Sequence, residues 1–183
     1  MTGAVLRFVA SATGARAVVE IGTGCGTSGI WLLRGMRPGG VLTTVDVEPE
    51  HQRLARAAFL AAGYPAGRYR LISGRALEVL PRLADGAYDL VFCDADPQEY
   101  PDYLEAAMRL LRAGGIVAFN SALGDDRAAD HAYIGADAII PDITGPGATA
   151  VRELCEQVRT DERLIPLLLP VGDGLLTAVK RPD

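Results

Sequence analysis

The chain has 183 residues, of which 49% are hydrophobic and 22% charged, and its formal net charge is −5. This composition is typical of a single globular domain over residues 1–183 and excludes a disordered chain. The negative charge, without any run of Lys or Arg, argues against nucleic acid as the main partner. No apolar run approaches the roughly 20 residues that cross a bilayer, so we expect no membrane partner.

The three cysteines, Cys25, Cys93 and Cys155, are scattered and lack the spacing of metal ligands. Reduced thiols of this kind are typical of a cytoplasmic protein. The opening residues MTGAVLRFVASATGARAVVEIG form a weak apolar stretch without a basic start or a convincing signal-peptide cleavage site. We therefore expect a cytoplasmic location.

Short apolar runs alternate with longer amphipathic ones along the first two thirds of the chain. Strands are predicted at residues 17–21, 41–45, 68–72, 88–93 and 116–119. Helices are predicted between them at residues 27–36, 49–62, 75–83 and 99–111, the last ended by Gly114 and Gly115. This alternation indicates βαβ units in a mostly parallel sheet with helices on both faces.

The alternation stops after residue 120. Residues 163–169 and 175–179 are strand-like, and the link between them is too short for a crossover helix. These strands are predicted to form an antiparallel hairpin, where a dinucleotide-binding domain would normally add further parallel strands. Residues 121–147 show no clear pattern: they are either a functional lid or mobile loop, or a surface loop with one short strand or helix.

The first predicted strand runs into the glycine-rich segment EIGTGCGTSG, residues 20–29. Glycines let the backbone turn sharply and approach a ligand closely, and a helix from Thr27 would point its amide groups at that ligand. Residues 24–29 also match the pattern G-x-G-x-x-G, so the glycines alone do not separate NAD from S-adenosylmethionine.

Two acidic residues extend this reading. Asp46 ends the second predicted strand, where a carboxylate can accept both ribose hydroxyls, and it can also cap the helix that begins at Pro49. Glu20 lies immediately before the glycines, where it suits the ammonium and sulfonium groups of S-adenosylmethionine and would repel a pyrophosphate. A buried carboxylate there is costly unless it is paired. Glu20 therefore favours S-adenosylmethionine over NAD.

Several motifs in order carry a resemblance to a known family. They read VVEIGTGCGTSGIWLL, LTTVDVEPEHQRLARAAF, RLISGRALEVLPRL, YDLVFCDADPQEYPDYLEAAMRLLRAGG and LLPVGDGLLTAVK. Over residues 17–180 the chain resembles the class I O-methyltransferases of the catechol and caffeoyl-CoA type, in particular their small bacterial members. The resemblance implies a Rossmann-like, doubly wound α/β fold with a seven-stranded, mostly parallel sheet that ends in an antiparallel C-terminal hairpin.

The resemblance also implies which residues hold the cofactor S-adenosylmethionine. They are Glu20, Gly22, Thr23, Gly24, Ser28, Asp46, Val47, Arg75, Ala76 and Asp94. The first five would hold the methionine part, and Asp46, with Val47 beside it, the ribose. Arg75 and Ala76 would line the adenine pocket, and Asp94 would lie near the methionine end.

The chain departs from the family pattern in three places. Metal-dependent members follow the fifth strand with Asp-Asn, where this chain has Asn120 and Ser121. With Asp94 these residues offer one anionic ligand and two neutral ones, a poor set for Mg²⁺, so use of a divalent metal is not carried over. Pro97 replaces a lysine that other members carry. Relatives also have a few dozen more residues before the first strand, so either that cover is missing here or the cofactor site is more open.

The remaining candidates for a base or an orienting group are Asp94, Asp96, Tyr100 and His131. Asp94 is the first choice because it ends a strand at the edge where such folds bind ligands. The other three have structural explanations that are at least as good as a catalytic role. Asp96 can be a helix N-cap, Tyr100 a packing residue and His131 a surface loop residue.

Two other conspicuous side chains receive no role at this point. His51 lies on the polar side of the predicted helix 49–62, and Trp31 has the spacing of a core residue.

The sequence thus predicts transfer of a methyl group from S-adenosylmethionine to a small-molecule acceptor, at a hydroxyl oxygen. A homodimer is expected from the resemblance alone. Two alternatives stay open: an S-adenosylmethionine-binding protein without activity and, with less support, an NAD-binding oxidoreductase, which explains neither Glu20 nor the terminal hairpin.

Overall fold

The computed structural model describes residues 1–123 and 147–182. The strands are β1 Ala17–Ile21, β2 Val41–Asp46, β3 Tyr69–Ser73, β4 Tyr88–Cys93, β5 Leu111–Asn120, β6 Leu164–Leu169 and β7 Leu175–Lys180. The α-helices are α1 Thr2–Ala12, α2 Thr27–Gly35, α3 Pro49–Ala61, α4 Ala76–Val79, α5 Tyr100–Leu110 and α6 Ala148–Thr160. Short 3₁₀ turns are η1 Ala66–Arg68, η2 Leu80–Arg82 and η3 Pro97–Glu99.

The seven strands form one sheet in the order β3-β2-β1-β4-β5-β7-β6. The first five strands pair in parallel, whereas β7 is antiparallel to both β5 and β6. The predicted doubly wound sheet with a C-terminal antiparallel hairpin is therefore confirmed. Because the chain leaves β1 toward β2 on one side and places β4 on the other, the sheet has a switch point between β1 and β4. Ligands bind at such points, beyond the carboxyl ends of the strands.

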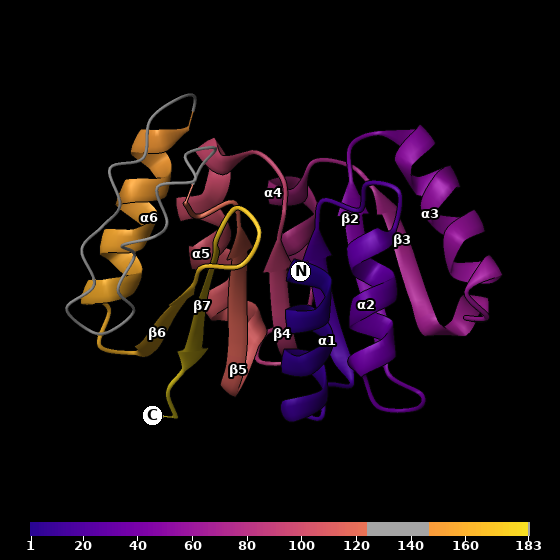
Figure 1. Ribbon diagram of the computed structural model, residues 1–183, viewed down its shortest axis with the longest axis horizontal. Helices are drawn as coiled ribbons and strands as arrows, with labels where there is room; N and C mark the ends of the chain where they lie inside the picture. The colour runs from indigo at the N-terminus through magenta and orange to yellow at the C-terminus, as the bar shows by residue number, and fades with distance from the viewer. Residues whose placement is uncertain (124–146, 183) are drawn as a thin grey trace.

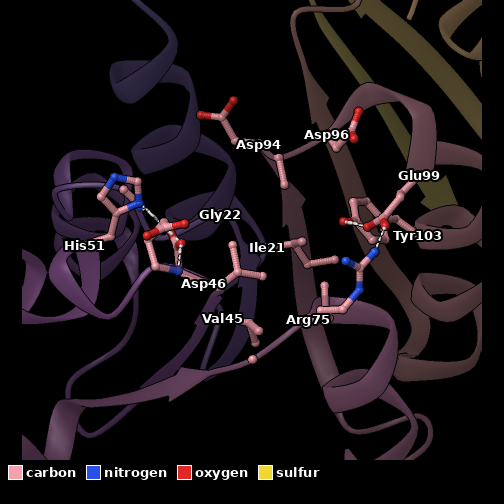
Figure 2. Close-up of a pocket in the computed structure, with 16 residues that line it drawn as sticks. Ile21, Gly22, Val45, Asp46, His51, Arg75, Asp94, Asp96, Glu99 and Tyr103 are labelled. Atoms are coloured by element: carbon pink, nitrogen blue, oxygen red, sulfur yellow. Dashed lines mark hydrogen bonds and ion pairs between the residues drawn. The ribbon is translucent and has the colours of Figure 1, made fainter.

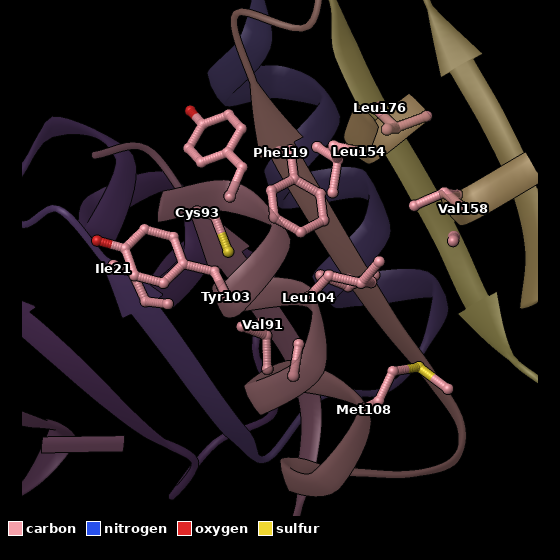
Figure 3. Close-up of a cluster of buried hydrophobic side chains, with 14 of the residues drawn as sticks. Ile21, Val91, Cys93, Tyr103, Leu104, Met108, Phe119, Leu154, Val158 and Leu176 are labelled. Carbon is pink, nitrogen blue, oxygen red and sulfur yellow. The ribbon is translucent and has the colours of Figure 1, made fainter. Parts of the chain in front are cut away.

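Helices cover both faces of the sheet. In Figure 1, α1 and α2 stand in front of the strands, whereas α4 and α5 lie behind them. The front layer buries side chains such as Leu6, Leu32 and Phe59 against the sheet. Figure 3 shows the rear cluster, where Leu104 of α5 and Leu154 of α6 pack with Phe119 of β5. No helix among the described residues is both long and apolar enough to span a membrane.

The structure differs from the predicted elements in four places. Helices α1 and α6 were not predicted. Gly114 and Gly115 were expected to end a helix but lie inside β5, which begins at Leu111. Gly114 has a φ of 74° and lies close to the place where the register between β4 and β5 shifts. The helix predicted at 75–83 changes from α4 to the 3₁₀ turn η2 at Pro81, because proline has no N–H for an α-helical hydrogen bond.

Candidate functional site

The glycine loop between β1 and α2 forms the base of the site. Its glycines adopt left-handed conformations, with φ of 95° at Gly22, 48° at Gly24 and 86° at Gly26. A Cβ at Gly22 would lie 2.0 Å from the backbone oxygen of Asp94, whereas one at Gly24 would meet nothing within 4 Å. Gly22 is thus required both by its φ and by the close approach of the chain leaving β4.

A pocket of about 420 Å³ opens above this loop at the switch point between β1 and β4. Figure 2 shows Asp46 and His51 on one side of it, and Arg75, Glu99 and Tyr103 on the other. We call it the β1–β4 pocket. Seven of the predicted cofactor-binding residues line it: Gly22, Gly24, Asp46, Val47, Arg75, Ala76 and Asp94.

Asp46 connects three parts of the β1–β4 pocket. Its carboxylate accepts hydrogen bonds from the backbone N–H of Gly24 and of Glu48, both at 2.9 Å. His51 Nδ1 lies 3.2 Å from Asp46 Oδ2. Asp46 therefore holds both the glycine loop and the turn before α3 while it also lines the pocket. It is not the helix cap that the sequence allowed, because the N-cap of α3 is Glu48.

Sequence reasoning gave no role to His51, which lines the same pocket. It lies in the first turn of α3, five residues after Asp46, so the turn that follows β2 brings the imidazole back to the carboxylate. The sequence does carry a signal for this contact, namely a histidine in the first turn of the helix that follows a strand-end acid.

Glu20 lies beneath the glycine loop and lines neither this pocket nor the second one described below. Its fully buried carboxylate accepts hydrogen bonds from the hydroxyls of Ser28, at 2.5 Å, and Thr44, at 2.6 Å. Burial raises the pKa of Glu20 to about 7, although these two hydrogen bonds oppose the rise. The pairing expected of a buried strand-end acid comes from these two hydroxyls.

The hydrogen bonds continue from Glu20 to α3. Thr23 Oγ1 lies 2.7 Å from Thr44 Oγ1, and Gln52 Nε2 donates to Thr23 Oγ1 at 3.2 Å and to the carbonyl of Ile72 at 3.1 Å. This buried chain of side chains connects the glycine loop, β2 and α3. It therefore fixes the loop from below.

A second pocket, of about 440 Å³, lies between the N-terminal end of α1 and the glycine loop. We call it the α1 pocket. Thr23 and Ser28 line it, together with Trp31 and Asn120. Trp31, which the sequence suggested as core, is only partly buried and forms a wall here. Gly22, Gly24 and Asp94 line both pockets, so the two cavities meet at Asp94.

Asp94 and Asn120 lie at the ends of adjacent strands. Asn120 Nδ2 donates a hydrogen bond to Asp94 Oδ1 at 3.0 Å, and Asn120 Oδ1 is buried without a hydrogen-bond partner among the described residues. Ser121 adopts a φ of 55°. One carboxylate with a neutral amide and a hydroxyl is a poor ligand set for this hard cation, so Asp94, Asn120 and Ser121 do not fit Mg²⁺. Within the described ranges, no other cluster of three His, Cys, Asp or Glu residues is placed to hold a metal.

Two of the other predicted candidates, Asp96 and Tyr100, make hydrogen bonds that stabilise the local backbone. Asp96 caps η3 by accepting a hydrogen bond from the N–H of Gln98, as the N-cap reading predicted. Tyr100 is buried, and its hydroxyl donates to the carbonyl of Asn120 at 3.0 Å. Burial raises the pKa of Tyr100 far above its usual value, so it is no base at neutral pH. His131 lies outside the described residues.

Across the β1–β4 pocket from Asp46, Arg75 Nη2 lies 2.9 Å from Glu99 Oε1, and Tyr103 donates its hydroxyl hydrogen to Glu99. Burial, followed by this hydrogen bond to Glu99, raises the pKa of Tyr103 far above its usual value, so its phenol stays neutral. These three residues close the side of the pocket where adenine is expected. The site as a whole is rich in carboxylates, from Asp46, Asp94, Asp96 and Glu99.

Comparison with known proteins gives consistent matches. The family profile described as O-methyltransferase matches residues 1–181. A protein from Mycolicibacterium smegmatis, provisionally named an O-methyltransferase, is 55% identical over 178 residues, which cover 97% of this chain and 80% of that protein.

Two solved structures show the same fold. The O-methyltransferase from Bacillus cereus, in complex with S-adenosylhomocysteine, has a TM-score of 0.83 at 28% identity, covering 98% of this chain and 80% of that one. The O-methyltransferase TomG from Streptomyces achromogenes, involved in tomaymycin synthesis and in complex with S-adenosylmethionine, has a TM-score of 0.79 at 31% identity, covering 99% and 80%.

Proposed function

The chain belongs to the O-methyltransferase family, and from this premise we propose that its site transfers the methyl group of S-adenosylmethionine to a hydroxyl oxygen of a small-molecule acceptor. The observation that supports this most strongly is the meeting of two pockets at Asp94. One pocket has the residues expected around a nucleoside, and the other opens beside it. A methyl donor and an acceptor require two such adjoining spaces.

The β1–β4 pocket is the proposed cofactor site. Asp46 would accept the ribose hydroxyls, with His51 and Val47 beside it, and Arg75 and Ala76 would line the adenine. The methionine part would extend past Gly22 and Gly24 into the edge of the α1 pocket where Thr23 and Ser28 lie, and the acceptor would occupy the rest of the α1 pocket. The local carboxylates favour the positive ammonium and sulfonium groups of this cofactor over a pyrophosphate. The buried Glu20 lines neither pocket and would act on the cofactor site only by holding the Ser28 hydroxyl.

Bound S-adenosylmethionine supplies a methyl group on a good leaving group, so the protein mainly has to align the acceptor, exclude water and help remove a proton. Asp94 is the proposed orienting group and proton acceptor, because it is the carboxylate shared by both pockets. Asn120 holds Asp94 through its amide hydrogen bond and would keep one of its oxygens directed toward the acceptor. In this proposal neither a metal nor a lysine takes part.

A homodimer remains a proposal. It is supported by apolar side chains on the surface: Ile165 and Leu167 of the edge strand β6 are 50% and 44% exposed, and Phe8 of α1 is 70% exposed. Exposed apolar residues on an edge strand mark an interaction site. Sedimentation of the wild type and of Leu167→Lys tests this, since a dimer through β6 would dissociate in the variant. The cytoplasmic location also remains a prediction, which fractionation of cells would test.

Formation of S-adenosylhomocysteine in the presence of a panel of phenols and catechols tests the proposed function. We expect turnover by the wild type and at least a tenfold loss in Asp94→Asn, with the affinity for S-adenosylmethionine retained within a few-fold. Asp102→Asn, on α5 away from both pockets, is the matched control. Binding of S-adenosylmethionine without turnover of any acceptor in a broad panel would favour the binding protein instead.

A further inference from the structure

A groove outside both pockets of the methyl-transfer site is lined by arginines. It lies between α1, α2 and the connection from α3 to β3, has a volume of about 470 Å³, and is bordered by Arg7, Trp31, Arg34, Tyr64 and Arg68. Leu33, Met36 and Pro38 complete its lining, so no carboxylate of the described residues lines it. We call it the arginine groove. Three arginines thus border one groove of a chain with a net charge of −5.

The arginines of the groove have no carboxylate partner in the part of the chain that the structure describes. Some arginines elsewhere do pair with carboxylates, for example Arg112 with Asp89 and Arg163 with Asp161. By contrast, Arg7 and Arg34 have no carboxylate partner among the residues that the structure describes. Arg68 donates to the neutral backbone carbonyls of residues 40 and 37, at 2.7 and 3.4 Å.

Two of the three guanidinium groups are held in place. Arg34 lies over the ring of Trp31, with its Cζ 5.2 Å from the ring centroid, and Arg68 lies over Tyr64 at 5.7 Å. Trp31 is itself fixed by α1, because a Cβ at Gly3 would lie 2.3 Å from the indole. Stacking uses the flat face of a guanidinium and leaves its edge for hydrogen bonds, which is the arrangement that binds oxyanions. Arg68 already uses Nε and Nη2 on backbone carbonyls, so the edge of Arg34 offers more donors to a ligand.

We propose that the arginine groove binds the phosphate group of a small anionic ligand. Phosphate matches several converging guanidinium donors, and the groove is large enough for a ligand that carries more than a single phosphate. Trp31 also borders the α1 pocket, so an anion in the groove lies against the same indole that walls the methyl-transfer site. The proposal rests on the arginines alone and stands whether or not methyl transfer is confirmed.

The chain has one tryptophan, so its fluorescence reports on this groove directly. We expect titration with inorganic pyrophosphate at low ionic strength to give a saturable change, with calorimetry as a second measure of the dissociation constant. Arg7→Gln and Arg34→Gln should each weaken binding about tenfold, because each removes a charged donor while keeping a polar side chain. Arg56→Gln, an exposed position on α3 outside the groove, should bind within twofold of the wild type.

Because Trp31 also borders the α1 pocket, the titration is repeated with saturating S-adenosylhomocysteine. Unchanged affinity for pyrophosphate is the expected result, whereas competition would place pyrophosphate in the methyl-transfer site and overturn the proposal. Absence of saturable binding, or equal losses in Arg34→Gln and Arg56→Gln, would overturn it as well. A comparison of pyrophosphate with adenosine monophosphate then separates a free inorganic ion from a phosphate carried by an organic molecule.

Discussion

The side-chain amide of Asn120 donates a hydrogen bond to the carboxylate of Asp94 across 3.0 Å, at the place where the two pockets meet. Asp94 directly follows β4 and Asn120 ends β5, and the parallel register pairs Cys93 with Phe119, so the two side chains are brought together. In metal-dependent relatives the sequence pattern has a second carboxylate at the Asn120 position. This chain has a neutral amide there, which donates its hydrogen bond to Asp94.

The first prediction concerns this pair. Chelation of divalent metals should leave wild-type methyl transfer unchanged within twofold. Asn120→Asp should lower activity at least tenfold without metal, because two adjacent carboxylates repel each other and raise the pKa of one of them. Added Mg²⁺ should restore part of that activity in the variant only. Loss of wild-type activity on chelation would contradict this account of the pair.

The second prediction concerns Glu20, whose pKa burial raises from its ordinary value of 4.5 to about 7. The folded state therefore binds this proton more tightly than the unfolded state, and the free energy of unfolding falls as pH rises from about 4.5 to 7. The shift corresponds to a loss on the order of 3 kcal/mol over that range. Urea denaturation at several pH values should show this slope in the wild type and not in Glu20→Gln. The control Glu105→Gln, at an exposed position, should keep the wild-type dependence of stability on pH. If Glu20→Gln also kept that dependence, Glu20 would not be the group responsible for it.

The third prediction compares two glycines of the same loop. Gly22→Ala should lower the free energy of unfolding by about 2–4 kcal/mol, because it adds a clash with the Asp94 backbone to an unfavourable φ. Gly24→Ala has only the unfavourable φ, and a loss of about 1 kcal/mol is expected. Equal losses would show that the approach of β4 to Gly22 is not tight.

The central strands β1, β2 and β4 could be predicted because each is a short, mostly buried apolar run, and the terminal hairpin because its link is too short for a helix. Helix α6 also shows a helical pattern, with Val151, Leu154, Cys155 and Val158 buried on one face. It was missed because the unassigned segment before it hid its start. Gly114 was misread because a left-handed glycine serves a strand irregularity as well as a helix end.

The positions of the site residues in the fold could be predicted from the sequence, but their burial and their hydrogen-bond partners could not. Sequence spacing placed Asp46 and Asp94 at the carboxyl edge of the sheet, and both line the β1–β4 pocket. The burial of Glu20 depends on hydroxyls from α2 and β2, which spacing does not reveal. The contact of His51 with Asp46 depends on the entry angle of α3, which only the folded chain shows.

The central claim is that the β1–β4 pocket binds S-adenosylmethionine through Asp46, and calorimetric titration tests it most directly. The wild type should bind S-adenosylmethionine and S-adenosylhomocysteine with micromolar affinity and NAD not measurably. Asp46→Asn should weaken both at least tenfold, since it weakens the ribose contact and the hold on Gly24. Glu50→Gln, at an exposed position on α3, should bind as the wild type does. Binding of NAD in preference to S-adenosylmethionine, or an unchanged affinity in Asp46→Asn, would contradict the claim.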